Sequence, residues 1–279
     1  MIPLRRPRLE GPLAEKLARR TARLSAEDAT AEAARRSWQR ASAVRKQVKA
    51  LLQGMSAGLA RCMYCGDSQG TDIDHFVPIA LAPARTFLWD NLLLACAHCN
   101  SNEKRERFPR DDAGASLLID PTAEEPHDHL RLSFMTGEYF PRSGKGAATI
   151  DVFGLNRWVL QRGREAAYAR CKSMLRDWVF LRAEGNEREA RRVEESLGLQ
   201  PFADVLHAMR HTPAPVATTV FGVDVSRALR SLDVAATSTV GLPEPRSVKG
   251  TSIGTPGGSG IIIPAAAAPV PPPPHATLR

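Results

Sequence analysis

The sequence predicts an α+β protein that is mostly helical, with a small cysteine-rich unit between two helical regions. Helical periodicity dominates residues 13–55 and the residues from Gly154 onward. Short segments with strand-like alternation are confined to the stretch between them. Two Cys-x-x-Cys pairs bracket the first of those segments. We therefore divide the chain into a basic helical N-terminal region (1–60), a core with a following hairpin (61–153), a helical C-terminal region (154–211) and a largely disordered Pro/Ala/Gly-rich tail (212–279).

The N-terminal region carries the excess positive charge of the chain. Residues 1–60 hold 13 Lys and Arg against 5 Asp and Glu, so the formal net charge of +8 resides there. We expect a helix over 13–24 and a longer one after Ser25, whose apolar positions recur from Ala34 to Met55 at helical steps. Basic residues lie off this stripe, and we predict that they contact nucleic acid phosphates: Arg45, Lys46 and Lys49. The alternative is a solvated helix face on an arginine-rich protein.

Cysteine usage and hydropathy predict a cytoplasmic protein with no membrane contact. No apolar run reaches the ~18 residues that a membrane span needs, and the N-terminus lacks the apolar segment of a secretory signal. In a reducing compartment, paired cysteines are metal ligands rather than disulfides. Two residues between thiols is the spacing that lets both reach one tetrahedral zinc. We therefore predict a closed structural zinc site from four residues: Cys62, Cys65, Cys96 and Cys99.

Between the two thiol pairs stands Asp74-His75, on a predicted short strand that Pro78 ends. A neutral imidazole can take a proton from water, and a neighbouring carboxylate is a hard oxygen ligand for an ion such as Mg²⁺. Adjacent strand residues point to opposite faces, so both reach one centre only where the strand ends or twists. The pair alone is uninformative, and its position between the thiol pairs gives it weight.

The order C-x-x-C, D-H, N-L, C-x-x-C-N resembles an HNH endonuclease of the zinc-bearing ββα-metal type. The resemblance implies that His75 is the general base and that Asn91 ties the loop that orients it. It also implies that Asp74 and Asn100 hold a catalytic divalent ion. Asn100 stands where the family often has His, which favours Mg²⁺ or Mn²⁺ over a softer metal. His98, inside the second thiol pair, is a less favoured substitute ligand because it is off the motif.

Two basic residues follow the second thiol pair. Lys104 lies four residues after Asn100, one helical turn, so we predict that it faces the same phosphate. We assign Arg105 to the same role, with a solvated charge as the alternative.

A wider similarity covers roughly residues 1–170. The segments IDHFVPIALAP, LLIDPTAEEPHDHL and TIDVFGLNR are similar to HNH proteins of Septu-type and retron-associated antiphage systems. That similarity implies a nuclease that acts with an ATPase partner in antiviral defence. The substrate stays open: we favour DNA, and a tRNA nuclease with the same site is the alternative. A zinc-stabilised nucleic-acid-binding or docking module without catalysis is the third possibility.

Overall fold

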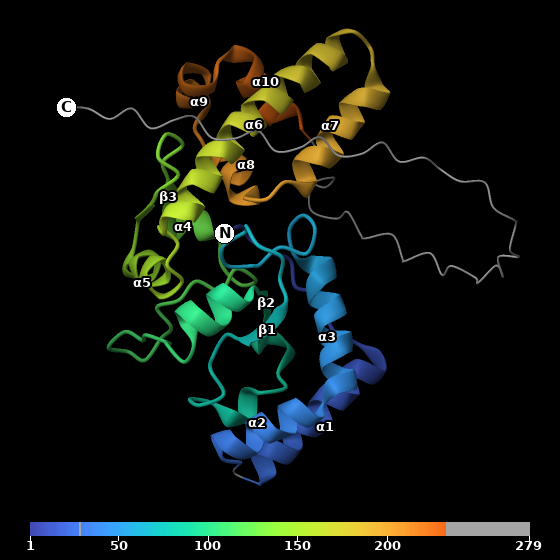
Figure 1. Ribbon diagram of the computed structural model, residues 1–279, viewed down its shortest axis with the longest axis vertical. Coiled ribbons are helices and arrows are strands. Elements are labelled where there is room, and N and C mark those ends of the chain that lie inside the picture. The colour runs from blue at the N-terminus through green and yellow to red at the C-terminus, as the bar shows by residue number, and fades with distance from the viewer. Residues whose placement is uncertain (28, 233–279) are drawn as a thin grey trace, which may run out of the picture. The chain divides into compact units, whose positions relative to one another are not determined.

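The computed structural model describes residues 1–27 and 29–232, and Figure 1 shows their course. Three helices make up the N-terminal region: α1 (Gly11–Ala26), α2 (Ala31–Arg40) and α3 (Ser42–Met55). The predicted single helix after Ser25 is wrong, because the chain breaks at Ala41, whose ψ is 41°. The Thr30 side chain caps α2 by accepting a hydrogen bond from the Ala33 N–H. The break lets each helix turn its own apolar side inward.

The core follows as two short strands and a helix. Strands β1 (Asp72–His75) and β2 (Leu92–Ala95) pair antiparallel, with His75 opposite Leu92. All four residues of β2 are buried, so this strand runs through the interior between α3 and the cysteine loops. Two single-turn 3₁₀ helices, η1 (Pro83–Arg85) and η2 (Trp89–Asn91), lie in the connection. The helix η3 (His98–Lys104) is a π-helix that closes the unit.

A short hairpin and two helices come next. Helix α4 (Pro126–His129) leads into β3 (Leu130–Leu132), which pairs antiparallel with β4 (Tyr139–Pro141). Helix α5 (Gly144–Val152) packs against β4 and α4. The hairpin predicted at the end of the core is therefore present.

The helical C-terminal region continues beyond its predicted end at residue 211. Helices α6 (Trp158–Ala183) and α7 (Glu187–Leu199) pack against each other, and α8 (Ala203–Arg210) packs on α6 (Figure 1). Two further helices, α9 (Ala214–Phe221) and α10 (Val223–Ser231), fall within the predicted tail, whose start at residue 212 is therefore wrong. They are ordered because α10 buries Val225 and Leu229 against neighbours that include α6. The rest of the predicted tail, 233–279, lies outside the described residues.

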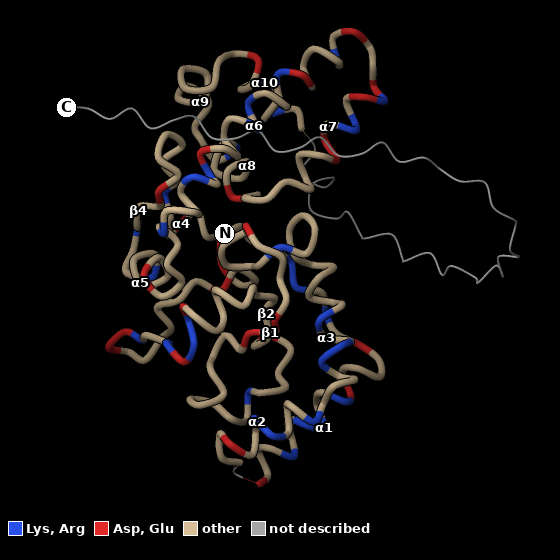
Figure 2. Tube along the Cα trace, in the orientation of Figure 1, with Lys and Arg blue, Asp and Glu red and all other residues tan. Residues whose placement is uncertain are grey.

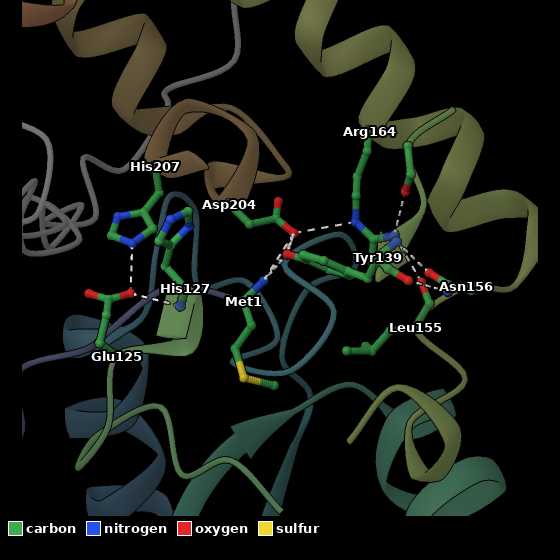
Figure 3. A network of polar contacts seen from close by, with 10 residues as sticks. Met1, Glu125, His127, Tyr139, Leu155, Asn156, Arg164, Asp204 and His207 are labelled. Atoms are coloured by element: carbon green, nitrogen blue, oxygen red, sulfur yellow. Dashed lines mark hydrogen bonds and ion pairs between the residues drawn. The ribbon is translucent and has the colours of Figure 1, made fainter. Parts of the chain in front are cut away.

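A buried charge network fastens α6 and α8 to the hairpin (Figure 3). The Arg164 guanidinium, 1% exposed, donates to the backbone carbonyls of Gly137 and Leu155 and to the Asp204 carboxylate. The Tyr139 hydroxyl donates to the same carboxylate at 2.5 Å. Each buried charge therefore has a partner of opposite sign, which offsets part of the cost of its burial. Arg164 Nη2 and Asp204 Oδ1 have no hydrogen-bond partner among the described residues. No helix within the described part of the chain is long and apolar enough to cross a membrane.

Candidate functional site: a cysteine cluster beside a buried histidine

The four predicted cysteine ligands converge in the structure. The Sγ atoms of Cys62, Cys65, Cys96 and Cys99 all lie within 4.8 Å of one another, and all four residues are buried and free of disulfides. Gly66, at φ +68°, closes the first turn by donating its N–H to the Cys62 carbonyl. In the second turn, the Asn100 N–H donates to the Cys96 carbonyl as η3 begins. We define these residues as the four-cysteine cluster.

The spacing and chemistry of the four-cysteine cluster fit zinc. A tetrahedral ion with Zn–S bonds of ~2.3 Å places its sulfur atoms about 3.8 Å apart, and the Sγ atoms of Cys65 and Cys96 are 4.0 Å apart. Hydrogen bonds from neighbouring thiols lower the pKa of Cys65 and of Cys96, whereas burial raises the pKa of Cys62 and bonds from the other thiols raise that of Cys99. Zinc binding would therefore release the protons that the metal-free cluster retains. His98 does not join it: its half-exposed ring lies 2.9 Å from a Glu103 carboxylate oxygen.

His75 is held as a neutral base in one orientation. Its Nε2 lies 3.0 Å from the backbone carbonyl oxygen of Thr86. Because a carbonyl only accepts, this contact assigns the proton of the neutral ring to Nε2 and leaves a lone pair on Nδ1. Burial lowers the pKa of His75 to about 4. The Trp38 ring of α2 packs edge-on at 4.7 Å between centroids and helps to exclude water.

Asp74 points to the other face of β1 and forms a buried ion pair. The Lys104 Nζ donates to Asp74 Oδ1 at 2.9 Å and to the His75 backbone carbonyl at 2.6 Å. The Tyr64 hydroxyl donates to Asp74 Oδ2 at 2.5 Å, and burial raises the pKa of Tyr64, so it remains a donor. Lys104 is 0% exposed. The prediction that it contacts phosphate is therefore wrong: the lysine reaches back beneath β1 and supports the strand that carries the histidine.

Replacing Lys104 with methionine is expected to lower the free energy of unfolding by about 3–5 kcal/mol, because the Asp74 carboxylate is left buried without its counter-charge. Urea unfolding of purified protein measures the change. The matched control is Lys46→Met, since Lys46 is exposed on α3 and its loss should cost no more than about 0.5 kcal/mol. Equal costs for the two variants would contradict the ion pair.

A different carboxylate lies beside Asn100. The Asn100 Nδ2 is 3.4 Å from Asp72 Oδ2, and both residues are partly exposed. Tyr64 and Lys104 each bond one Asp74 oxygen, and an ion shared by Asp74 and Asn100 stays a prediction. Asn100 Oδ1 accepts no hydrogen bond from the described residues. The Asp72 carboxylate and the Asn100 carbonyl are oxygen ligands, so these donors fit an ion of the Mg²⁺ or Mn²⁺ type.

Asn91 is fully buried at the end of the loop that contains Thr86. Its Oδ1 accepts from the Val77 N–H at 2.8 Å, and its Nδ2 donates to the carbonyls of Val77 and Arg85. These three bonds hold together both ends of the connection between β1 and β2. The position of the Thr86 carbonyl, and with it the His75 tautomer, depends on that closure. The arrangement is the one expected of a residue that orients the base.

The remaining predicted phosphate contacts lie at the surface. Arg105 is exposed and donates to the Ser101 carbonyl, while Lys46 is exposed and Arg45 and Lys49 are partly exposed on α3. Figure 2 shows Lys and Arg along α1, α2 and α3. These residues stay predicted phosphate contacts. A separate cavity of about 370 Å³ is lined by Phe76, Val77 and several arginines, and it does not include His75 or Asn100.

Sequence reasoning missed four groups that shape the site. Trp38 was assigned to a buried stripe without its contact to His75, and Tyr64 was passed over inside the first thiol pair. Asp72 had an available signal, since it lies two residues before Asp74 and a strand places such residues on the same face. The Thr86 carbonyl had none, because a backbone acceptor leaves no mark on the sequence.

Comparison with known proteins identifies this unit. Residues 62–106 match the family described as HNH endonuclease, so the chain contains an HNH endonuclease domain spanning the four-cysteine cluster, β1, β2 and η3. The predicted resemblance to that family is confirmed.

Particular relatives extend the match. The chain is similar to the Septu protein PtuB of Bacillus thuringiensis, with 28% identity over 104 residues, which cover 35% of this chain and 37% of that protein. The Septu protein PtuB of Bacillus mycoides (strain KBAB4) is 29% identical over 150 residues, covering 43% and 50%. Protein ea31 of Escherichia phage lambda is 42% identical over 58 residues, 20% of each chain. The chain therefore spans half or less of the length of these relatives. No solved structure matches significantly.

Proposed function

We propose that the protein is a metal-dependent endonuclease that hydrolyses phosphodiester bonds in nucleic acid, with DNA as the favoured substrate. The observation that carries the proposal is His75: a neutral imidazole held in one tautomer, inside an HNH domain that also contains the four-cysteine cluster. A zinc-binding module without catalysis has no use for a histidine whose pKa is lowered and whose ring is fixed by a backbone carbonyl. Such a histidine is unprotonated at neutral pH and can accept a proton.

In the proposed reaction, His75 Nδ1 takes a proton from the water that attacks phosphorus, and the bond from phosphorus to the leaving oxygen breaks. The Thr86 carbonyl holds the protonated Nε2, and Asn91 holds the loop that carries Thr86. Lys104 fixes the backbone of His75 through its carbonyl. A bound divalent ion would stabilise the negative charge on the leaving oxygen. Zinc in the four-cysteine cluster has no open coordination position, so we assign it a structural role.

The residues proposed to hold the catalytic ion are Asn100 and a carboxylate from β1. Asp74 is the ligand that the HNH resemblance implies, and Asp72 is the carboxylate that lies beside Asn100. Asp72→Asn and Asp74→Asn separate the two. The variant that lacks the true ligand should need a higher Mg²⁺ concentration for half-maximal cleavage. If Asp74 serves only as the partner of Lys104, Asp74→Asn should mainly lower stability.

Similarity to the Septu proteins supports a role as the effector of a bacterial antiphage system, working in the cytoplasm with an ATPase partner. The basic surfaces of α1 to α3 support a nucleic acid substrate, because phosphate neutralisation releases counterions. Duplex DNA and structured RNA both present such phosphates. A tRNA nuclease with the same site is therefore the second candidate.

The experiment is a cleavage assay with the purified full chain, with and without an ATPase of the proposed partner class. Supercoiled plasmid and total tRNA are incubated with Mg²⁺ or Mn²⁺, and EDTA serves as the control. We expect metal-dependent nicking or linearisation of the plasmid. Cleavage of tRNA alone would replace DNA with RNA as the substrate. Binding of either nucleic acid without cleavage under every condition would support the non-catalytic module instead.

A further inference from the structure

We propose that Glu125, His207 and His211 form a second metal site, for a zinc-like transition ion, away from the HNH domain. Their ligand atoms all lie within 4.8 Å of one another. Figure 3 shows the Glu125 carboxylate directed at the His207 ring, with His127 beside them. Two imidazoles and a carboxylate are a ligand set that zinc uses where it keeps one position open. The site is made of different residues from those of the four-cysteine cluster and of the proposed nuclease.

The local structure explains why these side chains meet. His207 and His211 stand four residues apart at the C-terminal end of α8, so they share one face of the helix. Glu125 is the N-cap residue of α4, and its carboxylate accepts a hydrogen bond from the His127 N–H at 3.0 Å. This bond directs a carboxylate oxygen toward α8, where it lies 2.9 Å from His207 Nε2.

The His211 ring is already oriented as a metal-bound histidine is, whereas His207 Nε2 would exchange its hydrogen bond to Glu125 for the metal. The His211 Nδ1 lies 3.0 Å from the His207 backbone carbonyl, which places the proton on Nδ1 and leaves Nε2 for a metal. A hydrogen bond from the far ring nitrogen to a carbonyl is the usual support of a ligating histidine. The His127 ring packs against His211, with centroids 4.7 Å apart.

The charge states suit a cation. Burial lowers the pKa of His207 and of His127. Burial opposes ionisation of Glu125, but hydrogen bonds from the His127 N–H and from His207 outweigh it and lower the pKa of that carboxyl. Neutral imidazoles with a carboxylate are the protonation states that metal binding requires. Nitrogen and oxygen ligands select zinc or a similar first-row ion over Mg²⁺.

The site would join two parts of the chain that are distant in sequence. Glu125 precedes the β3–β4 hairpin, and His207 and His211 belong to the C-terminal helices. On the same helix, Asp204 already contacts the hairpin through Tyr139. A metal bound at Glu125 would therefore add a second fastening along α8, one turn further toward its C-terminus.

Cobalt substitution tests the proposal on the full chain. Metal-free protein is titrated with Co²⁺: binding to the four-cysteine cluster gives thiolate-to-cobalt charge-transfer absorption, and binding to nitrogen and oxygen ligands gives only weaker visible bands. We expect the double variant His207→Gln/His211→Gln to bind one Co²⁺ fewer per chain than wild type, with the thiolate absorption unchanged. Equal cobalt content in wild type and double variant would overturn the proposal and leave a hydrogen-bonded His–Glu cluster.

Two further variants guard the result against misfolding. His211 is exposed, so the single variant His211→Gln should fold as wild type does. Its affinity for the second Co²⁺ should fall by at least the roughly 10–100-fold that loss of a supporting residue costs a metal site. The matched control is His129→Gln. His129 lies on α4, the helix that Glu125 caps, but its ring bonds the Ser143 hydroxyl instead of the proposed ligands. An equal loss in both single variants would also overturn the proposal.

Discussion

Replacing His75 with alanine is expected to reduce cleavage by at least the roughly 10²–10⁴-fold that a general base contributes. The fold and the zinc content should be retained, because the ring contacts Trp38 and one carbonyl but no cysteine. The measurement is the initial rate of plasmid nicking with Mg²⁺, taken together with the zinc content of the same sample. A His75→Ala protein that nicks as fast as wild type would contradict the assignment of the base.

The control is His98→Gln, a half-exposed histidine of the same domain whose ring bonds Glu103 and whose loss should leave the rate unchanged. The pH dependence gives a second readout. The neutral form of His75 is the active one, and its pKa of about 4 lies below the ordinary value of 6.5. On account of His75, the rate should therefore be flat from pH 7 down to about 5 and fall only below that. A decline that begins near pH 6.5 would mean that the ring is solvated.

The second large effect is expected for Cys99→Ser, which should lose zinc and unfold the HNH domain. Structural zinc contributes about 10–16 kcal/mol in small zinc-dependent peptides, so three thiolates with one poor ligand cannot hold the unit together. Cys99 is 0% exposed and lies in the first turn of η3. Loss of the metal should therefore also release the helix that carries Asn100 and Lys104. Zinc content and circular dichroism on heating measure both consequences.

The matched control is Cys171→Ser. Cys171 is a buried thiol on α6 that does not belong to the four-cysteine cluster, and burial raises its pKa to about 11. This variant should keep its zinc and show at most a modest loss of stability. If Cys99→Ser retained zinc as well as Cys171→Ser does, the four-cysteine cluster would not be a metal site.

Local sequence patterns predicted the parts of the fold that depend on neighbours in the chain. The thiol spacing predicted the convergence of Cys62, Cys65, Cys96 and Cys99, because two intervening residues fix the reach of each pair. Apolar periodicity predicted the buried faces of the N-terminal helices, and alternation predicted the β3–β4 hairpin. The assignment of Asn91 to the loop beside the histidine followed from the motif order alone.

What the sequence could not predict depends on contacts between distant segments. Lys104 looked like a phosphate ligand by helical spacing, but η3 is a π-helix, closed by the Arg105 N–H to the Asn100 carbonyl. Its wider turn changes which residues share a face. The pairing with Asp74 then removed the predicted metal ligand from solvent. Helices α9 and α10 were missed because their apolar residues gain burial only against helices such as α6.

The central claim is that one domain separates a structural zinc from a catalytic base. The most direct test measures zinc content and cleavage rate side by side in wild type, His75→Ala and Cys99→Ser. We expect His75→Ala to keep its zinc and lose cleavage, and Cys99→Ser to lose both. Loss of zinc to the same extent in the two variants, or full cleavage by His75→Ala, would contradict that separation.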